Sequence, residues 1–221
     1  MRITHTFRNM TVLTPVLQLL LGLMVIRSVA EAFIWGNAWR LMDANPLPME
    51  RVKAQMELAK TLAMVGNGLY AVFAAMFLWW VFRANQRARK LGCQGFGFSA
   101  KLASLGFLIP FFNYWVAYKG MRDLRQASQY GDAYDDRMPP SVWVWYLLLL
   151  IAHVAMLGEP FFLPAYEITP SVGEMQEDIV ILVILLMIKL PCYIATMVLA
   201  WKIHRWQQKL ARPDFARAPQ A

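Results

Sequence analysis

Long apolar runs separated by short polar segments dominate this chain. Four of the runs reach the roughly 20 residues of helix needed to cross about 30 Å of hydrocarbon. They lie near 11–35, 61–82, 142–163 and 179–201. Only helices and closed barrels satisfy every backbone group in lipid, and these runs are too long and too continuously apolar for barrel strands. The pattern therefore predicts an all-α integral membrane protein, a four-helix bundle in which residues 1–221 form a single transmembrane domain.

A fifth apolar run, at 102–118, is shorter and is interrupted by Gly106, Pro110 and Asn113. Pro110 frees backbone carbonyl groups near the middle of the run, and Asn113 lies one turn away, where its amide can bond them. Both flanks of the run are basic, and short loops rich in Lys and Arg stay in the cytoplasm. A single crossing here would leave one basic flank outside. We therefore predict that the segment 102–128 either enters the membrane and returns, or lies at its surface.

Composition agrees with a membrane location. Hydrophobic residues make up 58% of the 221 residues, whereas roughly 45–50% is usual in soluble domains. The two cysteines, Cys93 and Cys192, are far apart in the sequence. Their spacing predicts neither a disulfide framework nor a zinc site.

The positive charge is concentrated on one side of the predicted membrane. The N-terminal arm, both flanks of the short run and the tail at 202–221 together carry sixteen Lys or Arg and five Asp or Glu. The loop at 164–178 carries four acidic residues and no Lys or Arg. We therefore predict a multi-pass protein of a bacterial inner membrane with both termini in the cytoplasm. The net charge of +8 then indicates membrane sidedness, and no nucleic-acid partner is expected.

Tryptophans gather at the predicted helix ends, where their amphipathic rings suit the headgroup level. Those expected at the cytoplasmic surface are Trp79, Trp80, Trp143, Trp145, Trp201 and Trp206. Trp35 and Trp39 are expected at the outer surface. The alternative is that these side chains belong to an ordinary core.

The cations around the short run are predicted to form a basic, lipid-facing surface. Its members are Arg83, Arg87, Arg89, Lys90, Lys119, Arg122 and Arg125. Each cation near an anionic leaflet contributes roughly 1 kcal/mol of attraction. From Trp115 onward a helix is expected, and Asp123 lies four residues after Lys119, where the two side chains can pair. Anionic lipid headgroups on the cytoplasmic side are therefore the expected partner, with a membrane protein or a second copy of the chain as further candidates.

Five ionisable residues fall inside the predicted helices, where a charge costs at least about 2.5–3.5 kcal/mol at the helix centre. They are Arg27, Glu31, His153, Glu159 and Lys189. Arg27 and Glu31 lie one turn apart and can pair, and we expect Lys189 within reach of Glu31 or Glu159. Two interpretations stay open at this point. The five groups either neutralise one another and fix helix register, or line a polar cavity that conducts protons or a small solute.

No catalytic or cofactor chemistry is indicated. The chain has no phosphate-binding P-loop, no Gly-x-Ser-x-Gly and no His-Glu-x-x-His motif, which removes the usual anchors of enzyme chemistry. His153 and His204 differ in depth by roughly 20 Å at the helical rise, so they cannot ligate one haem iron together. We expect no metal and no cofactor.

The centre of the chain resembles the bacterial membrane proteins catalogued as domain of unknown function 4328. The resemblance covers about fifty residues, from Trp79 to Ser128. The matching pieces are Arg83-Ala84, Arg89, Leu91-Gly92, Phe98-Ser99, Ile109-Pro110, Asn113, Trp115, Tyr118, Met121-Arg122-Asp123-Leu124 and Ala127-Ser128. The resemblance implies a small multi-pass helical protein, and it brings no activity, substrate or catalytic residues.

The sequence therefore predicts a non-enzymatic role. We expect an interaction or accessory protein that engages lipid or a membrane partner through its basic surface and the segment around Pro110 and Asn113. The alternative is a small transporter or channel that uses the buried charges. A membrane-embedded enzyme that acts on lipid has the least support.

Overall fold

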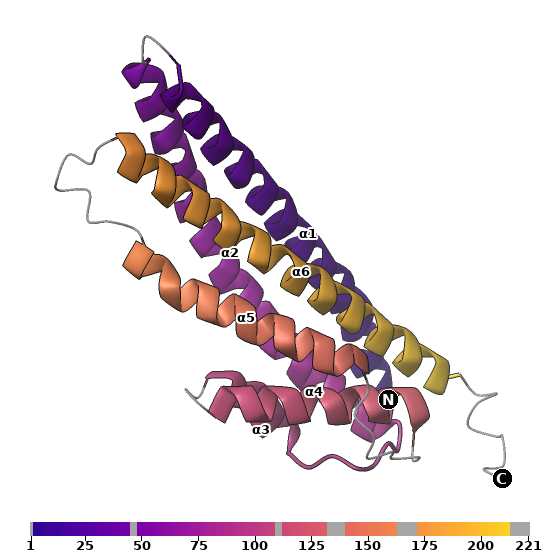
Figure 1. Cartoon of the computed structure of the whole chain (residues 1–221). Coiled ribbons are helices and arrows are strands. Elements are labelled where there is room, and N and C mark those ends of the chain that lie inside the picture. The colour runs from indigo at the N-terminus through magenta and orange to yellow at the C-terminus, as the bar shows by residue number, and fades with distance from the viewer. Residues whose placement is uncertain (1, 45–47, 109–111, 132–139, 163–171, 213–221) are drawn as a thin grey trace. The chain divides into compact units, whose positions relative to one another are not determined.

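The computed structural model is helical, and no strand occurs in the ranges that it describes. Those ranges are 2–44, 48–108, 112–131, 140–162 and 172–212. Within them, the side chains of 2–9, 112–113, 153–162 and Glu174 lie outside the description. The elements are α1 (Arg2–Met42), α2 (Met49–Lys90), α3 (Ala100–Leu105), the short 3-10 helix η1 (Gly106–Leu108), α4 (Phe112–Tyr130), α5 (Pro140–Phe162) and α6 (Val172–Leu210) (Figure 1).

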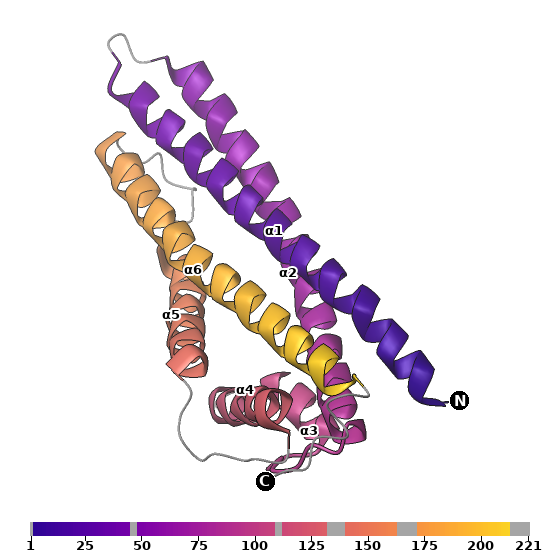
Figure 2. The same ribbon diagram turned by 90° about the vertical axis from the view of Figure 1, so that its right-hand side faces the viewer.

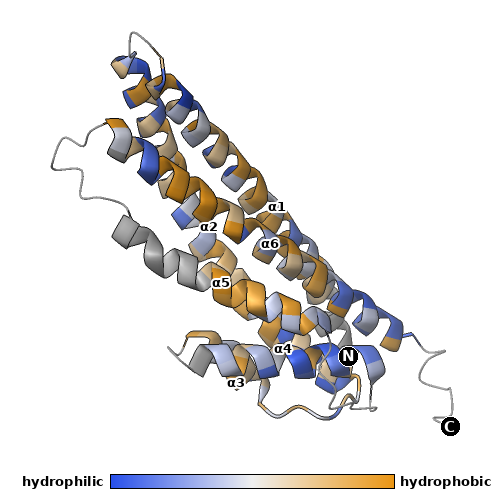
Figure 3. Cartoon of the chain, viewed as in Figure 1, coloured by the Kyte–Doolittle hydropathy of each residue, from blue (hydrophilic) through white to orange (hydrophobic). Residues whose placement is uncertain are grey.

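Within the residues that the structure describes, three helices are long and apolar enough to cross a membrane. The qualifying stretches are Met10–Met42, Met49–Lys90 and Met175–Leu210. At 1.5 Å per residue, the 42 residues of α2 extend about 63 Å, whereas a bilayer with its headgroups measures about 40–45 Å. The long helices therefore continue past the apolar runs that predict them. Figure 3 shows α6 hydrophobic over most of its length, while α4 mixes hydrophilic and hydrophobic turns.

The fourth predicted crossing coincides with α5, a helix of 23 residues. Its apolar stretch with described side chains is Pro140–Ala152, which is shorter than a full crossing needs. The helix that the sequence predicts is present, and its crossing of the membrane stays a prediction. The same holds for the four-helix bundle as a whole.

The short interrupted run forms two helical pieces that pack together. Ser99 caps α3, because its Oγ accepts a hydrogen bond from the Leu102 backbone N–H at 3.2 Å. Gly106 lies directly against Val116 of α4, so closely that a Cβ at Gly106 would overlap the valine side chain. Pro110 lies outside the described residues, and Asn113 is in α4 with its side chain outside the description. Whether the segment is re-entrant or surface-lying therefore stays a prediction.

The chain divides into two compact units, each built from parts of several helices. Unit 1 contains Met1–Leu20, Phe73–Leu147 and Ala195–Ala221, and unit 2 contains Leu21–Val72 and Leu148–Ile194. Unit 2 has an apolar core made by one face each of α1, α2 and α6. Its buried members are Ala32, Trp35, Ala38, Met42, Val52, Met56, Ala59, Ile179, Leu182 and Leu186.

Large apolar side chains point outward along the long helices of unit 2. Met64 is 69% exposed, and Ile26, Phe33 and Ile184 are also exposed. Soluble monomers rarely expose apolar surface on this scale, whereas lipid-facing helices require it. This arrangement supports a location within a membrane.

Unit 1 is held together by polar side chains that bridge its helices. Both views place α3 and α4 next to the C-terminal part of α2 (Figure 2). The Trp80 indole donates to Thr14 Oγ1 at 3.1 Å, which links α2 to α1. The Trp145 indole donates to Thr196 Oγ1 at 3.0 Å, which links α5 to α6. Such hydrogen bonds stabilise helix pairs where the surrounding medium is as apolar as the helices themselves.

The tryptophan pairs do not lie together at the surface as the sequence suggests. Trp79 is 52% exposed and Trp143 is half-exposed, while their neighbours Trp80 and Trp145 are buried and hydrogen-bonded. Trp35 is also buried. The prediction of a surface position is therefore wrong for Trp80, Trp145 and Trp35. Adjacent or alternate residues on a helix face different directions, so one member of the pair Trp79/Trp80 and one member of the pair Trp143/Trp145 enter the core.

Candidate functional site

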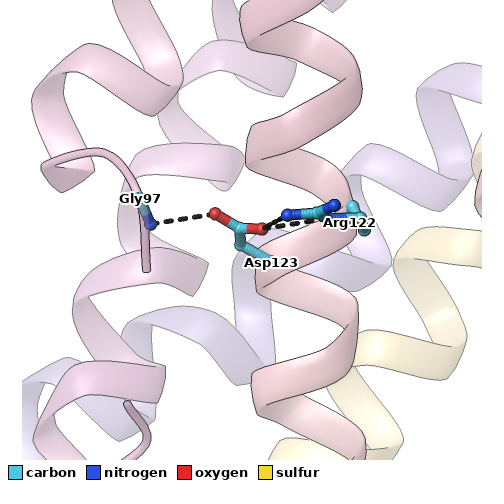
Figure 4. A network of polar contacts seen from close by, with 3 residues as sticks. All are labelled: Gly97, Arg122 and Asp123. Atoms are coloured by element: carbon cyan, nitrogen blue, oxygen red, sulfur yellow. Dashed lines mark hydrogen bonds and ion pairs between the residues drawn. The ribbon is translucent and has the colours of Figure 1, made fainter. Parts of the chain in front are cut away.

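A buried carboxylate fixes the loop between α2 and α3 to helix α4. Asp123 Oδ2 accepts a hydrogen bond from the Gly97 backbone N–H at 2.9 Å, and Oδ1 accepts two from Arg122, at 3.2 and 3.1 Å (Figure 4). The side chain of Asp123 is almost fully buried. A Cβ at Gly97 would lie 2.8 Å from Lys119 Cε, so a larger residue here would displace the end of that lysine side chain. The ion pair in the structure is with Arg122, whereas helix spacing suggested Lys119.

Cations around this loop lie over aromatic rings. The Arg89 guanidinium is 4.3 Å from the centre of the Phe96 ring, and it donates to the Phe98 carbonyl. Lys119 Nζ lies 5.3 Å from the Phe98 ring centre and 5.2 Å from that of Trp115. These distances fall within the roughly 6 Å over which a ring face attracts a cation. The rings therefore hold charged groups in place beside the half-exposed Trp115.

The same pairing recurs on α6. Arg205 lies 5.0 Å from the Trp201 ring centre, and Arg125 of α4 lies 5.3 Å from that of Trp206. Burial lowers the pKa of Arg125, with an opposing influence from Tyr130. A guanidinium still keeps its charge at neutral pH. Unit 1 thus presents several ordered positive charges next to amphipathic rings.

The predicted basic surface is only partly at the surface. Arg89 and Lys90 are exposed, and the half-buried members are Arg83, Lys119, Arg122 and Arg125. Arg87 is 3% exposed, so its placement on a lipid-facing surface is wrong in this structure. Arg87 is buried because it falls on the face of α2 that also carries the buried Trp80, Ala84 and Ala88.

Arg87 belongs to a group of buried polar side chains that the sequence analysis did not identify. The other members are Asn85, Gln126, Ser128, His204 and Gln207. Asn85 Nδ2 donates to the Val81 carbonyl at 3.0 Å, and Gln207 bonds both α2 and α4. The sequence carried a signal, since Gln207 lies one turn after His204, in register with the apolar face of α6. Because Gln207 bonds Ser128 and Asn85 bonds the backbone of its own helix, these contacts fit a structural role.

An open groove runs between α2 and α3. It has a volume of about 460 Å³ and is lined by Leu78, Trp79, Phe82, Lys101, Ser104 and Leu105. Ser104 Oγ donates to the Leu78 carbonyl at 2.7 Å, which fastens α3 to α2 and satisfies the hydroxyl group. The remaining lining is apolar except for Lys101. Leu102 and Leu108 are exposed nearby.

Two of the five ionisable residues predicted for the membrane interior are in contact in the structure. Arg27 and Glu31 form an ion pair in unit 2, as their spacing predicts. Gly66 of α2 lies against the Arg27 guanidinium, and a Cβ there would overlap it. Lys189 is buried, at 7% exposure, and its contact with Glu31 or Glu159 stays a prediction. The side chains of His153 and Glu159 lie outside the description.

Within the described part of the chain, no group of three or more His, Cys, Asp or Glu side chains is arranged to hold a metal ion. Cys93 and Cys192 are both buried.

Comparison with known proteins yields a single family. Searches against curated proteins and against solved structures find no match. A family model described as "Domain of unknown function (DUF4328)" matches residues 43–205, a range that contains α2 to α5 and most of α6. The match confirms the resemblance carried by the central segment and extends it well beyond that segment. The chain therefore belongs to the DUF4328 family.

Proposed function

We propose that this chain is a non-enzymatic accessory protein of the bacterial inner membrane that binds anionic phospholipid through unit 1. The groove between α2 and α3 carries the proposal. Its walls are apolar, and Lys101 is the only ionisable residue among those described as lining it. This combination suits a ligand with an acyl chain and a negatively charged headgroup, because the chain needs an apolar wall and the phosphate needs a cation.

The surroundings of the groove favour a lipid over a soluble ligand. Trp79 lines the groove and is half-exposed, as is usual for indoles at the level of lipid headgroups. Leu102, Leu105 and Leu108 expose apolar side chains on the same short segment. An exposed apolar segment of this kind is stable in the headgroup region, where its leucines reach the acyl chains.

The cations that lie over aromatic rings provide the surface for neighbouring headgroups. Arg89, Lys119 and Arg205 are each held beside a ring, so less side-chain freedom is lost when a phosphate binds. The distribution of charge in the sequence supports a position of this surface at the cytoplasmic leaflet. In the proposed topology, α1, α2, α5 and α6 cross the membrane, both termini are cytoplasmic, and α3 and α4 stay on the cytoplasmic side.

A second candidate function is the transport of protons or a small solute. The observation that favours it is the burial of Glu31 and Lys189 in unit 2, since charges inside a membrane commonly mark a conduction route. Arg27 already neutralises Glu31, which favours a structural role for that pair. Proteoliposomes loaded with a pH-sensitive dye distinguish the two functions. A proton flux that disappears in Glu31→Gln and Lys189→Met supports transport, and the accessory role predicts no flux.

Native mass spectrometry of the full chain with phosphatidylglycerol tests the lipid proposal. Leu105→Trp fills the groove, and Leu58→Trp places the same bulk at an exposed leucine of unit 2 that does not line it. The first substitution is expected to reduce lipid retention, and the second to leave it unchanged. Equal retention in the two variants contradicts the proposal.

Charge is tested in the same assay with Lys101→Gln and the matched control Lys202→Gln, an exposed lysine of unit 1 outside both the groove and the predicted basic surface. Loss of one cation near a phosphate costs about 1 kcal/mol, so Lys101→Gln is expected to weaken phosphatidylglycerol binding about fivefold. Zwitterionic phosphatidylcholine is expected to show a smaller change. An equal loss in Lys202→Gln contradicts a specific role for the groove.

A further inference from the structure

We propose that unit 2 contains a separate binding site for a phosphoryl anion, built between α1 and α2 close to the loop that joins them. The site is a pocket of about 420 Å³ lined by Asn37, Arg40, Leu41, Arg51, Ala54 and Gln55. This inference is independent of the lipid groove, because the two sites share no residue and lie in different units.

Helical spacing brings the lining residues to one pocket. Residues 37, 40 and 41 follow an i, i+3, i+4 pattern on α1, and residues 51, 54 and 55 follow the same pattern on α2. Each set therefore lies on a single helix face. Packing of Ala38 and Met42 with Val52 and Met56 in the core of unit 2 holds the two helices together beside the pocket.

Four of the six lining side chains carry N–H donors. Arg40 and Arg51 each offer a guanidinium fork that matches the oxygens of a phosphoryl group. Asn37 and Gln55 add amide donors, and both are half-buried. Leu41 and Ala54 complete the wall. A phosphoryl group has enough oxygens to accept from both arginines and from an amide at once.

The two arginines have no acidic partner in the described part of the chain. No acidic residue lines the pocket, and neither arginine takes part in an ion pair or other recorded polar interaction there. The neighbouring carboxylates are engaged elsewhere. Glu50 pairs with Lys53 at 3.7 Å, Glu57 pairs with Lys60 at 2.9 Å, and Asp43 accepts from Gln176 at 2.8 Å.

The position of the pocket leaves two sources for the anion. Its residues lie beyond the apolar runs at 11–35 and 61–82, on parts of α1 and α2 that continue past the predicted crossings. The site is therefore close to a membrane surface and open to water. A dissolved phosphate and the phosphate of a lipid headgroup present the same chemistry to it.

The inference is tested by measuring the binding of two anionic probes to the full-length protein in detergent micelles. The ionic strength is kept constant, because salt screens exposed charges. One arm titrates inorganic phosphate by calorimetry, and the other measures phosphatidylglycerol in phosphate-free buffer by native mass spectrometry. The pocket variant is Arg40→Gln/Arg51→Gln. The matched control is Lys53→Gln/Lys60→Gln, which removes the same charge from exposed residues outside the pocket.

We expect at least one probe to bind the wild type saturably. The same probe is expected to bind the pocket variant at least about tenfold more weakly, because charge-assisted hydrogen bonds are lost. The control is expected to bind as the wild type does. The arm that shows the loss identifies the source of the anion. Ala54→Trp, which fills the pocket and keeps both arginines, is expected to weaken binding as well. An equal loss in the lysine control overturns the inference, as does a pocket variant that binds both probes as the wild type does or a wild type that binds neither.

Discussion

The amide of Gln207 on α6 donates a hydrogen bond to the Ser128 hydroxyl on α4, with 2.9 Å between Nε2 and Oγ. The same Nε2 donates to the Ala84 carbonyl on α2 at 3.1 Å. One fully buried side chain thereby joins three helices of unit 1, at the place where α4 meets α2 and α6. The position of α4, and with it the basic and aromatic surface, depends on this contact.

Replacing Gln207 with Leu is therefore expected to destabilise unit 1. The substitution leaves the Ser128 hydroxyl buried with one partner fewer, which costs about 1–3 kcal/mol. Thermal unfolding of the detergent-solubilised protein measures the effect. Gln208→Leu is the control, because Gln208 contacts His204 within α6 and its replacement is expected to change stability much less. Equal losses in the two variants contradict the role assigned to Gln207.

Asp123→Asn is expected to loosen the loop between α2 and α3. The asparagine oxygen still accepts from the Gly97 N–H, but the ion pair with Arg122 is lost. We expect a loss of about 1–3 kcal/mol, as for a hydrogen bond to a charged group. Limited proteolysis within 91–99 measures the loosening, with Glu57→Gln as an exposed control. Unchanged cleavage relative to that control argues against Asp123 as the anchor of the loop.

Gly66→Ala is expected to disturb the ion pair in unit 2, because the new Cβ overlaps the Arg27 guanidinium. Gly68→Ala on the same helix meets nothing within 4 Å, so it is expected to be neutral or to stabilise by up to about 1 kcal/mol through helix propensity. Adding Arg27→Ala to Gly66→Ala is expected to remove the steric part of the loss. Thermal unfolding of the four proteins gives the coupling. Additive effects of the two substitutions show that Gly66 does not contact Arg27.

Trp79 and Trp80 are expected to respond differently to brominated lipid. Trp79 is exposed on unit 1 and Trp80 is buried against Thr14, so bromine in the acyl chains reaches only the first. Trp79→Phe is expected to remove part of the fluorescence quenching, and Trp80→Phe to leave the quenched fraction unchanged. A larger loss of quenching in Trp80→Phe than in Trp79→Phe contradicts a lipid-facing groove.

Hydropathy predicts the positions of the long helices well, because lipid imposes both the helix and its apolar length. It does not predict where the helices end. Helix α2 begins at Met49, far before the apolar run at 61, because Val52, Met56 and Ala59 pack in the core of unit 2. Those residues recur at helical spacing, so a periodicity signal for the extension was present in the sequence.

The candidate site was harder to predict. The pair Arg27–Glu31 follows from local spacing alone and is present. The burial of Arg87 contradicts its predicted surface position, because a count of charges takes no account of which helix face each charge occupies. The groove at Lys101 and the pocket at Arg40 and Arg51 depend on the register between two helices. A single sequence does not determine that register.

Accessibility of single cysteines in intact cells tests the proposed topology, on which the lipid proposal rests, most directly. Lys90→Cys and Tyr130→Cys lie on the two flanks of the segment that contains α3 and α4. Lys53→Cys lies on the outer side of the membrane in the proposed topology. All three positions are exposed. The proposed topology predicts that a membrane-impermeant maleimide labels Lys53→Cys in intact cells. It predicts that Lys90→Cys and Tyr130→Cys are labelled only after the cells are opened. Labelling of either flank in intact cells would contradict the account, because it would show that the short segment crosses the membrane.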